Sequence, residues 1–217
     1  MPNRRVEIPK GDGKVRTLQL LCIRGGVVQG ALKLIPEAVF GADFCPTSHG
    51  FRPKRSPHRV LAEVRRSVMR HLSNVIEVDL SRDFDTIQQS VLLDQIAKRI
   101  QGPQVMHLVK QIIKAGGMVG IPERCPSSPL AANIYLSEVD WYFEAIRRRT
   151  VEGEYGAVNY HRFADDLFIT ASRHPTKRGW AERALQQCGE ALGLTGFDLH
   201  RVPKQSGDGH FILMTPK

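Results

Sequence analysis

The chain contains few cysteines, and none of them stands in a metal-binding pattern. Cys22, Cys45, Cys125 and Cys188 are far apart and form no Cys-x-x-Cys pair. The sequence therefore predicts neither a zinc site nor a disulfide framework. Isolated cysteines are typical of a reducing compartment, so we expect a cytoplasmic protein.

Long apolar runs, internal repeats and low-complexity tracts are also absent from the sequence. No apolar segment approaches the length that spans a bilayer. Residues 1–10 are charged and contain no apolar run, so we expect no secretory signal there. The 217 residues are 41% hydrophobic, enough to bury a sizeable core as one domain or as two lobes.

Acidic residues are the minority among the charged ones. Asp and Glu number 22 against 31 Lys and Arg, which gives a formal net charge of +9. A surplus of this size indicates a polyanionic partner, either nucleic acid or an acidic membrane face. Any single basic cluster is equally well explained as a solvated surface. The clusters are Arg4-Arg5, Arg52 to Arg55, Arg65-Arg66 and Arg147 to Arg149.

Two adjacent carboxylates, Asp165 and Asp166, interrupt a stretch of aromatic and β-branched residues. Like charges side by side are unfavourable in a half-buried place unless a cation lies between them. A second strand pattern, residues 75–80, alternates apolar residues with Glu77 and Asp79. Aspartates on two neighbouring strands can hold two Mg²⁺ ions, as in phosphoryl-transfer polymerases and nucleases. The competing interpretation of the pair is an ordinary Asp-containing turn.

The periodicity of apolar residues predicts mixed helices and mainly antiparallel strands, which is an α+β fold. Ser56 and Pro57 predict the N-cap and first turn of a helix. We expect that helix to bury Val60, Leu61, Val64 and Val68. Two hairpins are expected, over residues 6–20 and over residues 157–171, the second turning at Asp165-Asp166.

The remaining helices and strands are predicted from the same kind of pattern. A helix over residues 27–40 is expected to break near Pro36. Ser128-Pro129 predicts the start of a long helix that ends at about Arg149. Further helices are expected over residues 90–99, 105–114 and 178–192, and short strands over 75–80 and 211–213.

Five motifs, in order between residues 8 and 170, resemble those of the reverse transcriptases of bacterial group II introns. The longest is Ser48 to Ser56, which is similar to the family's Ser-x-Gly-Phe-Arg-Pro-x-Arg-Ser signature, and Phe163 to Asp166 stands where the family has Tyr-Ala-Asp-Asp. The other motifs are Ile8-Pro9-Lys10 with Gly13-Lys14 and Arg16, Asp79 to Ile87, and Ser128 to Leu136.

This resemblance implies the fingers and palm of a right-hand polymerase, with an antiparallel palm sheet packed on helices and the thumb absent. The fingers are expected at about 1–72 and 88–119, and the palm at about 73–87 and 120–217. The implied function is an RNA-directed DNA polymerase that adds dNTPs to a primer 3′-hydroxyl, as a truncated and impaired copy. Its implied partners are an RNA template, the primer–template duplex, dNTPs and its own intron RNA, with no membrane.

Two alternatives stay open beside the polymerase. One is a non-catalytic RNA-binding remnant of an intron maturase, which keeps the basic surface without turnover. The other is a CRISPR-associated or diversity-generating relative, which differs in biology rather than in chemistry.

The resemblance also implies a metal site. Asp79, Asp165 and Asp166 would be catalytic and would hold two Mg²⁺ ions, with Mn²⁺ as an alternative. The backbone carbonyl of Leu80 would add an oxygen ligand. Phe84 would lie under the sugar and favour deoxynucleotides by crowding a 2′-hydroxyl.

Basic residues of the matched motifs are expected at phosphates. Lys10, Lys14 and Arg52 would contact the incoming triphosphate. The residues expected along the template–primer backbone are Arg55, Arg65, Arg66 and Arg147.

One loop departs from the family pattern. Glu123-Arg124-Cys125 stands where the family has Gln-Gly-Gly. Glycines allow a close backbone approach to a nucleotide, and Glu123 brings a negative charge toward the phosphates. We therefore expect an altered nucleotide pocket.

Overall fold

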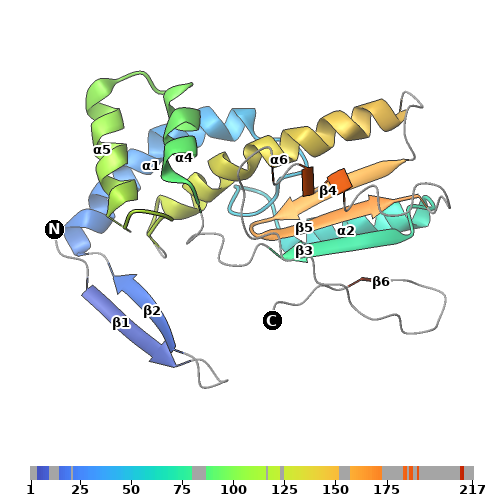
Figure 1. Ribbon diagram of the computed structural model, residues 1–217, viewed down its shortest axis with the longest axis horizontal. Helices are drawn as coiled ribbons and strands as arrows, with labels where there is room; N and C mark the ends of the chain where they lie inside the picture. Colours follow the sequence, from blue (N-terminus) through green and yellow to red (C-terminus); the bar gives the residue numbers. More distant parts are fainter. Residues whose placement is uncertain are drawn as a thin grey trace. The chain divides into compact units, whose positions relative to one another are not determined.

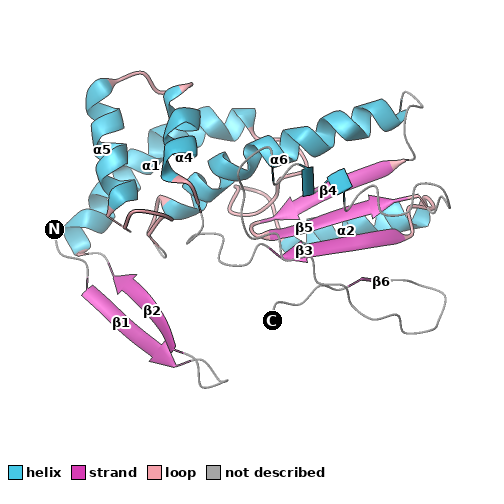
Figure 2. Cartoon of the chain, viewed as in Figure 1, coloured by secondary structure: helices cyan, strands magenta, loops and turns pink. Residues whose placement is uncertain are grey.

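The computed structural model describes most of the chain up to residue 172. The described residues are 4–9, 15–20, 22–79, 87–115, 117–122, 125–151 and 157–172, together with 183–184, 186–187, 190 and 211–212. Figure 1 traces the chain and Figure 2 separates its helices from its strands.

By packing, the chain divides into two compact units. One comprises Met1–Asp43 and Asp83–Tyr135, and the other comprises Phe44–Arg82 and Leu136–Lys217. These bounds differ from the predicted fingers and palm at residues 44–72, 83–87 and 120–135. The two units are defined by contacts between residues and not by their function, so the fingers and palm bounds stay a prediction.

The second unit contains a sheet whose described strands follow the order β4-β5-β3-β6. Its strands are β3 (Asn74–Asp79), β4 (Val158–Phe163), β5 (Asp166–Ala171) and β6 (Phe211–Ile212). Both β3 and β4 pair antiparallel with β5, whereas β6 pairs parallel with β3. The expected α+β fold with a mainly antiparallel sheet is therefore confirmed.

Alternation along the strands gives this sheet two different faces. Tyr160 of β4 stacks on Phe143 of α6 (Ser128–Val151), with ring centroids 4.8 Å apart. The opposite face carries Val75, which packs with Val60 and Val64 of α2 (Pro57–Met69). The sheet of the second unit is thus enclosed by α2 on one face and by the later part of α6 on the other (Figure 1).

Helix α2 begins as predicted, with Ser56 at the N-cap and Pro57 in the first turn. Val60 and Val64 are buried, and the half-buried Val68 packs against them. The predicted burial of Leu61 is wrong, because its side chain is 59% exposed. Consecutive helical residues are rotated by about 100°, so Leu61 falls outside the stripe that faces the sheet.

The first unit contains the predicted N-terminal hairpin and several helices. Strand β1 (Arg4–Pro9) pairs antiparallel with β2 (Val15–Leu20). Helix α1 (Ile23–Asp43) runs through Pro36, so the predicted break there is wrong. Proline removes one backbone hydrogen bond, but its fixed φ suits a helix, and the helix continues on both sides.

Helices α4 (Gln89–Ala97) and α5 (Pro103–Lys114) lie close to their predicted ranges. The buried Gln89 side chain donates to the carbonyls of Gly117 and Gly120, at 3.0 and 2.8 Å, and so fixes the loop after α5. The predicted helix over 178–192 lies largely outside the described residues. In the part of the chain that the structure describes, no helix is long and apolar enough to cross a bilayer.

Candidate catalytic site

The hairpin of β4 and β5 turns at Ala164 and Asp165, and Asp166 begins β5. Ala164 adopts a φ of 57°, in the left-handed region. A non-glycine residue rarely occupies that region, since its Cβ crowds the following carbonyl at a cost of about 1–2 kcal/mol. Neighbouring groups must therefore hold this turn in place.

The strand register brings Asp79, the last residue of β3, to the carboxylate pair. Asp79 and Asp166 are partners in the β3–β5 ladder, and Phe163 opposes Asp166 from the other side. Directly opposed residues in an antiparallel ladder have Cα atoms about 4.5–5.5 Å apart and side chains on the same face. The backbone therefore sets Asp79 beside Asp165-Asp166.

This arrangement has the chemistry that a divalent cation requires. Asp165 and Asp166 are half-buried, and carboxylate oxygens are the ligands that Mg²⁺ prefers. Among the side chains that the structure describes, no cluster of three His, Cys, Asp or Glu residues occurs. The Asp79 side chain is outside that set, so the ligand roles of the three aspartates stay a prediction.

A buried ion pair lies directly behind the turn. Arg162, the residue before Phe163, is completely buried and bonds Asp140 of α6 through two nitrogens, Nε to Oδ1 at 2.8 Å and Nη2 to Oδ2 at 2.7 Å. The Tyr160 hydroxyl also donates to Asp140 Oδ1, at 2.8 Å. Nη1 of Arg162 donates to the carbonyl of Ala164 at 2.8 Å. The ion pair thus reaches the backbone of the turn itself.

The Ser48–Ser56 motif packs against the same turn. The amide of His49 donates to the Arg162 carbonyl at 2.8 Å, and the amide of Arg162 donates to the Thr47 carbonyl at 2.9 Å. Gly50 then approaches the turn so closely that a Cβ atom there would lie 2.7 Å from Ala164 Cα. Two motifs that are far apart in sequence therefore form one packed structure.

Arg52 and Arg55, both predicted at phosphates, brace this loop. Arg52 Nη1 donates to the carbonyls of Cys45 and Ser48, at 2.8 Å each. Arg55 Nη1 donates to the Pro46 carbonyl at 2.8 Å. Burial lowers the pKa of each arginine from its ordinary value. Both side chains thus stabilise the loop, and this role does not depend on contact with a nucleotide.

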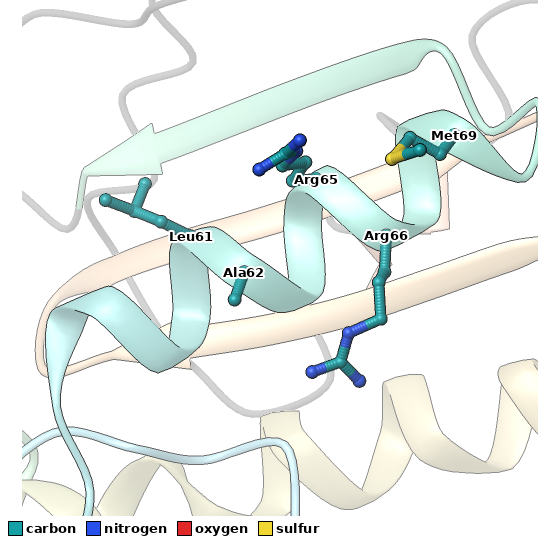
Figure 3. A pocket seen from close by; sticks show the side chains of 5 residues that line it. All are labelled: Leu61, Ala62, Arg65, Arg66 and Met69. Carbon is teal, nitrogen blue, oxygen red and sulfur yellow. The ribbon is translucent and has the colours of Figure 1, made fainter.

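Of the four basic residues predicted along a nucleic-acid backbone, Arg55 lies in the loop before α2, Arg65 and Arg66 lie on α2, and Arg147 lies on α6. Arg65 and Arg66 are exposed on α2, beside a hollow of about 440 Å³ (Figure 3). Its other lining residues are Leu61, Ala62 and Met69. Arg66 Nη1 lies 2.9 Å from Glu63 Oε2. On α6, Arg147 bonds Glu144 through Nε and Nη2, at 2.8 and 2.7 Å, and these hydrogen bonds lower the pKa of Glu144.

Several predicted site residues lie outside the described residues. They are Lys10, Lys14, Leu80, Phe84 and Glu123. Of the altered loop, Cys125 is described; it is buried, and burial raises the pKa of its thiol.

Two important residues of the site, Arg162 and Asp140, were not singled out from the sequence. A signal was present: Arg162 is a charged residue in a predicted strand that also contains Val158, Tyr160 and Phe163, and Asp140 stands between Val139 and Trp141 in a helix. Isolated charges in apolar segments are seldom buried unless they are paired. The sequence does not say which charge pairs with which.

Comparison with known proteins places these observations in a family. A family model described as "Reverse transcriptase (RNA-dependent DNA polymerase)" matches residues 8–201. Protein YkfC of Escherichia coli (strain K12) is 36% identical over 159 residues, which cover 65% of this chain and 41% of that protein. The group II intron-encoded protein LtrA of Lactococcus lactis subsp. cremoris is 32% identical over 149 residues, covering 64% of this chain and 25% of that protein.

Two further proteins, one from a sequence comparison and one from a comparison of structures, are similar to this chain. The putative COX1/OXI3 intron 2 protein of Saccharomyces cerevisiae is 33% identical over 153 residues, which cover 66% of this chain and 18% of that protein. The solved structure of a truncated apo telomerase from Candida tropicalis shares the fold, with a TM-score of 0.57 and 14% identity over 90% of this chain and 48% of that chain. The chain spans less than half the length of each of these relatives.

Proposed function

The chain belongs to the reverse transcriptase family, in its group II intron type, and we propose that it acts as an RNA-directed DNA polymerase. In this proposal it adds dNTPs to the 3′-hydroxyl of a primer that is paired to an RNA template. The observation that carries the proposal is the register of Asp79 with Asp166. It supports a site shared by Asp79 and the adjacent pair Asp165-Asp166, which begins 86 residues later in the sequence.

The carboxylates of Asp79, Asp165 and Asp166 would supply the oxygens of the site, and the carbonyl of Leu80 would add one more. When bound there, two divalent ions, Mg²⁺ or alternatively Mn²⁺, would lower the pKa of the primer hydroxyl and neutralise charge on the leaving pyrophosphate. The turn of the hairpin holds Asp165 and Asp166 on a rigid backbone, which favours a fixed ligand geometry.

Nucleotide selection would fall to a second group of residues. Lys10, Lys14 and Arg52 would contact the triphosphate, because ammonium and guanidinium groups neutralise phosphate charge. Phe84 would exclude a 2′-hydroxyl. Glu123 would lie near the same phosphates with an unfavourable charge, and so would reduce the rate.

The net charge of +9 supports binding to a nucleic acid. Arg55, Arg65, Arg66 and Arg147 would contact the backbone of the template–primer duplex or of an intron RNA. The four cysteines are far apart in sequence and form no Cys-x-x-Cys pair, which supports a reducing, cytoplasmic setting.

A second candidate function is RNA binding without catalysis. The replacement of Gln-Gly-Gly by Glu123-Arg124-Cys125 favours it, because side chains occupy positions where glycine would let the backbone approach a nucleotide. The basic surface would be retained in that case.

Primer extension on poly(rA)/oligo(dT) with Mg²⁺ separates the two functions. We expect template-dependent synthesis by the unmodified chain and a loss of about 10²-fold or more in Asp165→Asn, since one charged group in the site is removed. Asp94→Asn is the matched control, because Asp94 is exposed on α4; it should retain full synthesis. Salt-sensitive RNA binding with no synthesis by any of the proteins would instead support the binding function.

A further inference from the structure

The most unusual group in the second unit is the completely buried guanidinium of Arg162. Its Nε and Nη2 bond both oxygens of Asp140, which is itself completely buried. A buried ion pair rarely adds net stability compared with apolar residues of similar volume, because both charges lose their hydration. Its presence here is therefore better explained by what it orients than by the stability it adds.

The other hydrogen bonds of Arg162 show which groups it orients. Nη1 donates to the carbonyl of Ala164 at 2.8 Å, and Nη2 donates to Ser48 Oγ at 2.9 Å. Ala164 is the residue with a φ of 57°, and Asp165 follows it directly. The guanidinium thus links helix α6, the loop before α2 and the carboxylate turn.

We propose that Arg162, oriented by Asp140, is a positioning residue that fixes the Ala164 carbonyl and thereby the carboxylates of Asp165 and Asp166. The inference rests on the proposed function, since it assigns a purpose to Arg162 in the same site. Arg162 is completely buried, so in this proposal it acts through the backbone that carries the ligands. Groups of this kind set ligand orientation, and their loss typically lowers metal affinity or activity by about 10–100-fold.

Arginine suits this position and lysine does not. The guanidinium presents donors in a rigid plane, so it bonds the carboxylate on one side and the turn carbonyl on the other. A lysine ammonium is a single point of charge on a flexible stem. It can keep the ion pair with Asp140, but it cannot also span to Ala164 and Ser48.

The variant Arg162→Lys tests this inference, because it keeps the buried charge and removes the bond to the turn. We expect Mn²⁺ binding, measured by titration calorimetry on the whole chain, to weaken about 10-fold. In primer extension we expect kcat to fall by a similar factor while KM for the template–primer stays unchanged, since the basic surface is intact.

Tyr160→Phe is the matched control. It removes the 2.8 Å hydrogen bond to Asp140 Oδ1 from the same buried cluster but leaves the Arg162–Ala164 bond in place. We expect Tyr160→Phe to lower the melting temperature without changing Mn²⁺ affinity or kcat. If Arg162→Lys does not fold, Asp140→Asn is measured instead, again by Mn²⁺ affinity and kcat. Asparagine has nearly the same shape as aspartate, and Arg162 remains in the protein.

The outcomes separate this inference from the proposed function. If the unmodified chain folds but neither binds Mn²⁺ nor extends a primer, the proposed function fails and this inference fails with it. If the unmodified chain is active and Arg162→Lys matches Tyr160→Phe in Mn²⁺ affinity and kcat, only the positioning role is overturned.

Discussion

Replacing Gly50 by alanine should damage the site although position 50 carries no catalytic group. An added Cβ would lie 2.7 Å from Ala164 Cα and closer still to the Ala164 amide nitrogen, whereas real Cβ atoms essentially never come within 3.0 Å of a heavy atom. Both neighbours are backbone atoms, so no flexible side chain can move aside. Either the loop at Gly50 or the turn at Ala164 must shift.

The expected loss of stability and of activity follows from this shift of the backbone. Inserting one methyl group into a packed contact typically costs about 1–3 kcal/mol of unfolding free energy. A displacement of about 1 Å in groups that position a reaction can cost about 10²-fold in rate. We therefore expect Gly50→Ala to lower primer extension by about 10²-fold while the protein remains folded.

The assay compares Gly50→Ala with Gly41→Ala at equal protein concentration. A Cβ at Gly41, inside α1, meets nothing within 4 Å, and alanine stabilises a helix interior by about 0.5–1 kcal/mol relative to glycine. The control should therefore melt slightly higher and extend primers normally. Normal synthesis by Gly50→Ala, with an unchanged melting temperature, would show that the contact between the loop and the turn is not as described.

Three further outcomes are expected. Asp140→Leu should lower the free energy of unfolding in urea by about 3–5 kcal/mol, because it leaves the Arg162 charge buried and unpaired; a loss below about 1 kcal/mol would mean that water reaches the guanidinium. Burial lowers the pKa of His161 to about 4, so the unfolded chain binds more protons between pH 4 and 6.5, and stability should fall by about 1–3 kcal/mol as pH drops through that window. Urea unfolding of His161→Gln should show a weaker dependence of stability on pH, and a dependence equal to that of the unmodified chain would show that His161 is not its source. Arg65→Ala should reduce the magnitude of the slope of log K against log salt for RNA binding by about 1; an unchanged slope would remove Arg65 from the interface.

The elements of the sheet could be predicted from the sequence, because their signals are local. Alternation of apolar residues predicted the strand that ends at Asp79, and the Asp165-Asp166 pair predicted a tight hairpin connection. The register between Asp79 and Asp166 could not be derived in this way. It depends on the pairing of two strands that are far apart in sequence, and the alternation of apolar residues alone allows other registers.

Two predictions about the helices were wrong for physical reasons. Leu61 belongs to the apolar pattern of α2, yet the sheet contacts only the stripe through Val60 and Val64. Pro36 is a helix breaker by local propensity, but tertiary context overrides propensity, and α1 continues through it.

The contacts of Arg52 and Arg162 were not predictable from the sequence. The phosphate contact of Arg52 stays a prediction, whereas the hydrogen bonds of its Nη1 to the carbonyls of Cys45 and Ser48 were not expected. Arg162 was not singled out, although it links the turn to α6. Charged residues in a basic chain look alike in sequence, and only three-dimensional packing shows which of them have acceptors close by.

The anomalous scattering of Mn²⁺, in a crystal of this chain with a primer–template duplex and a non-hydrolysable dNTP, tests the shared metal site most directly. Two peaks are expected about 3.5–4 Å apart, each within bonding distance of oxygens from Asp79 and from the Asp165-Asp166 pair. Carboxylate oxygens of Asp79 lying more than about 10 Å from those of the pair, or Mn²⁺ bound elsewhere, would contradict it.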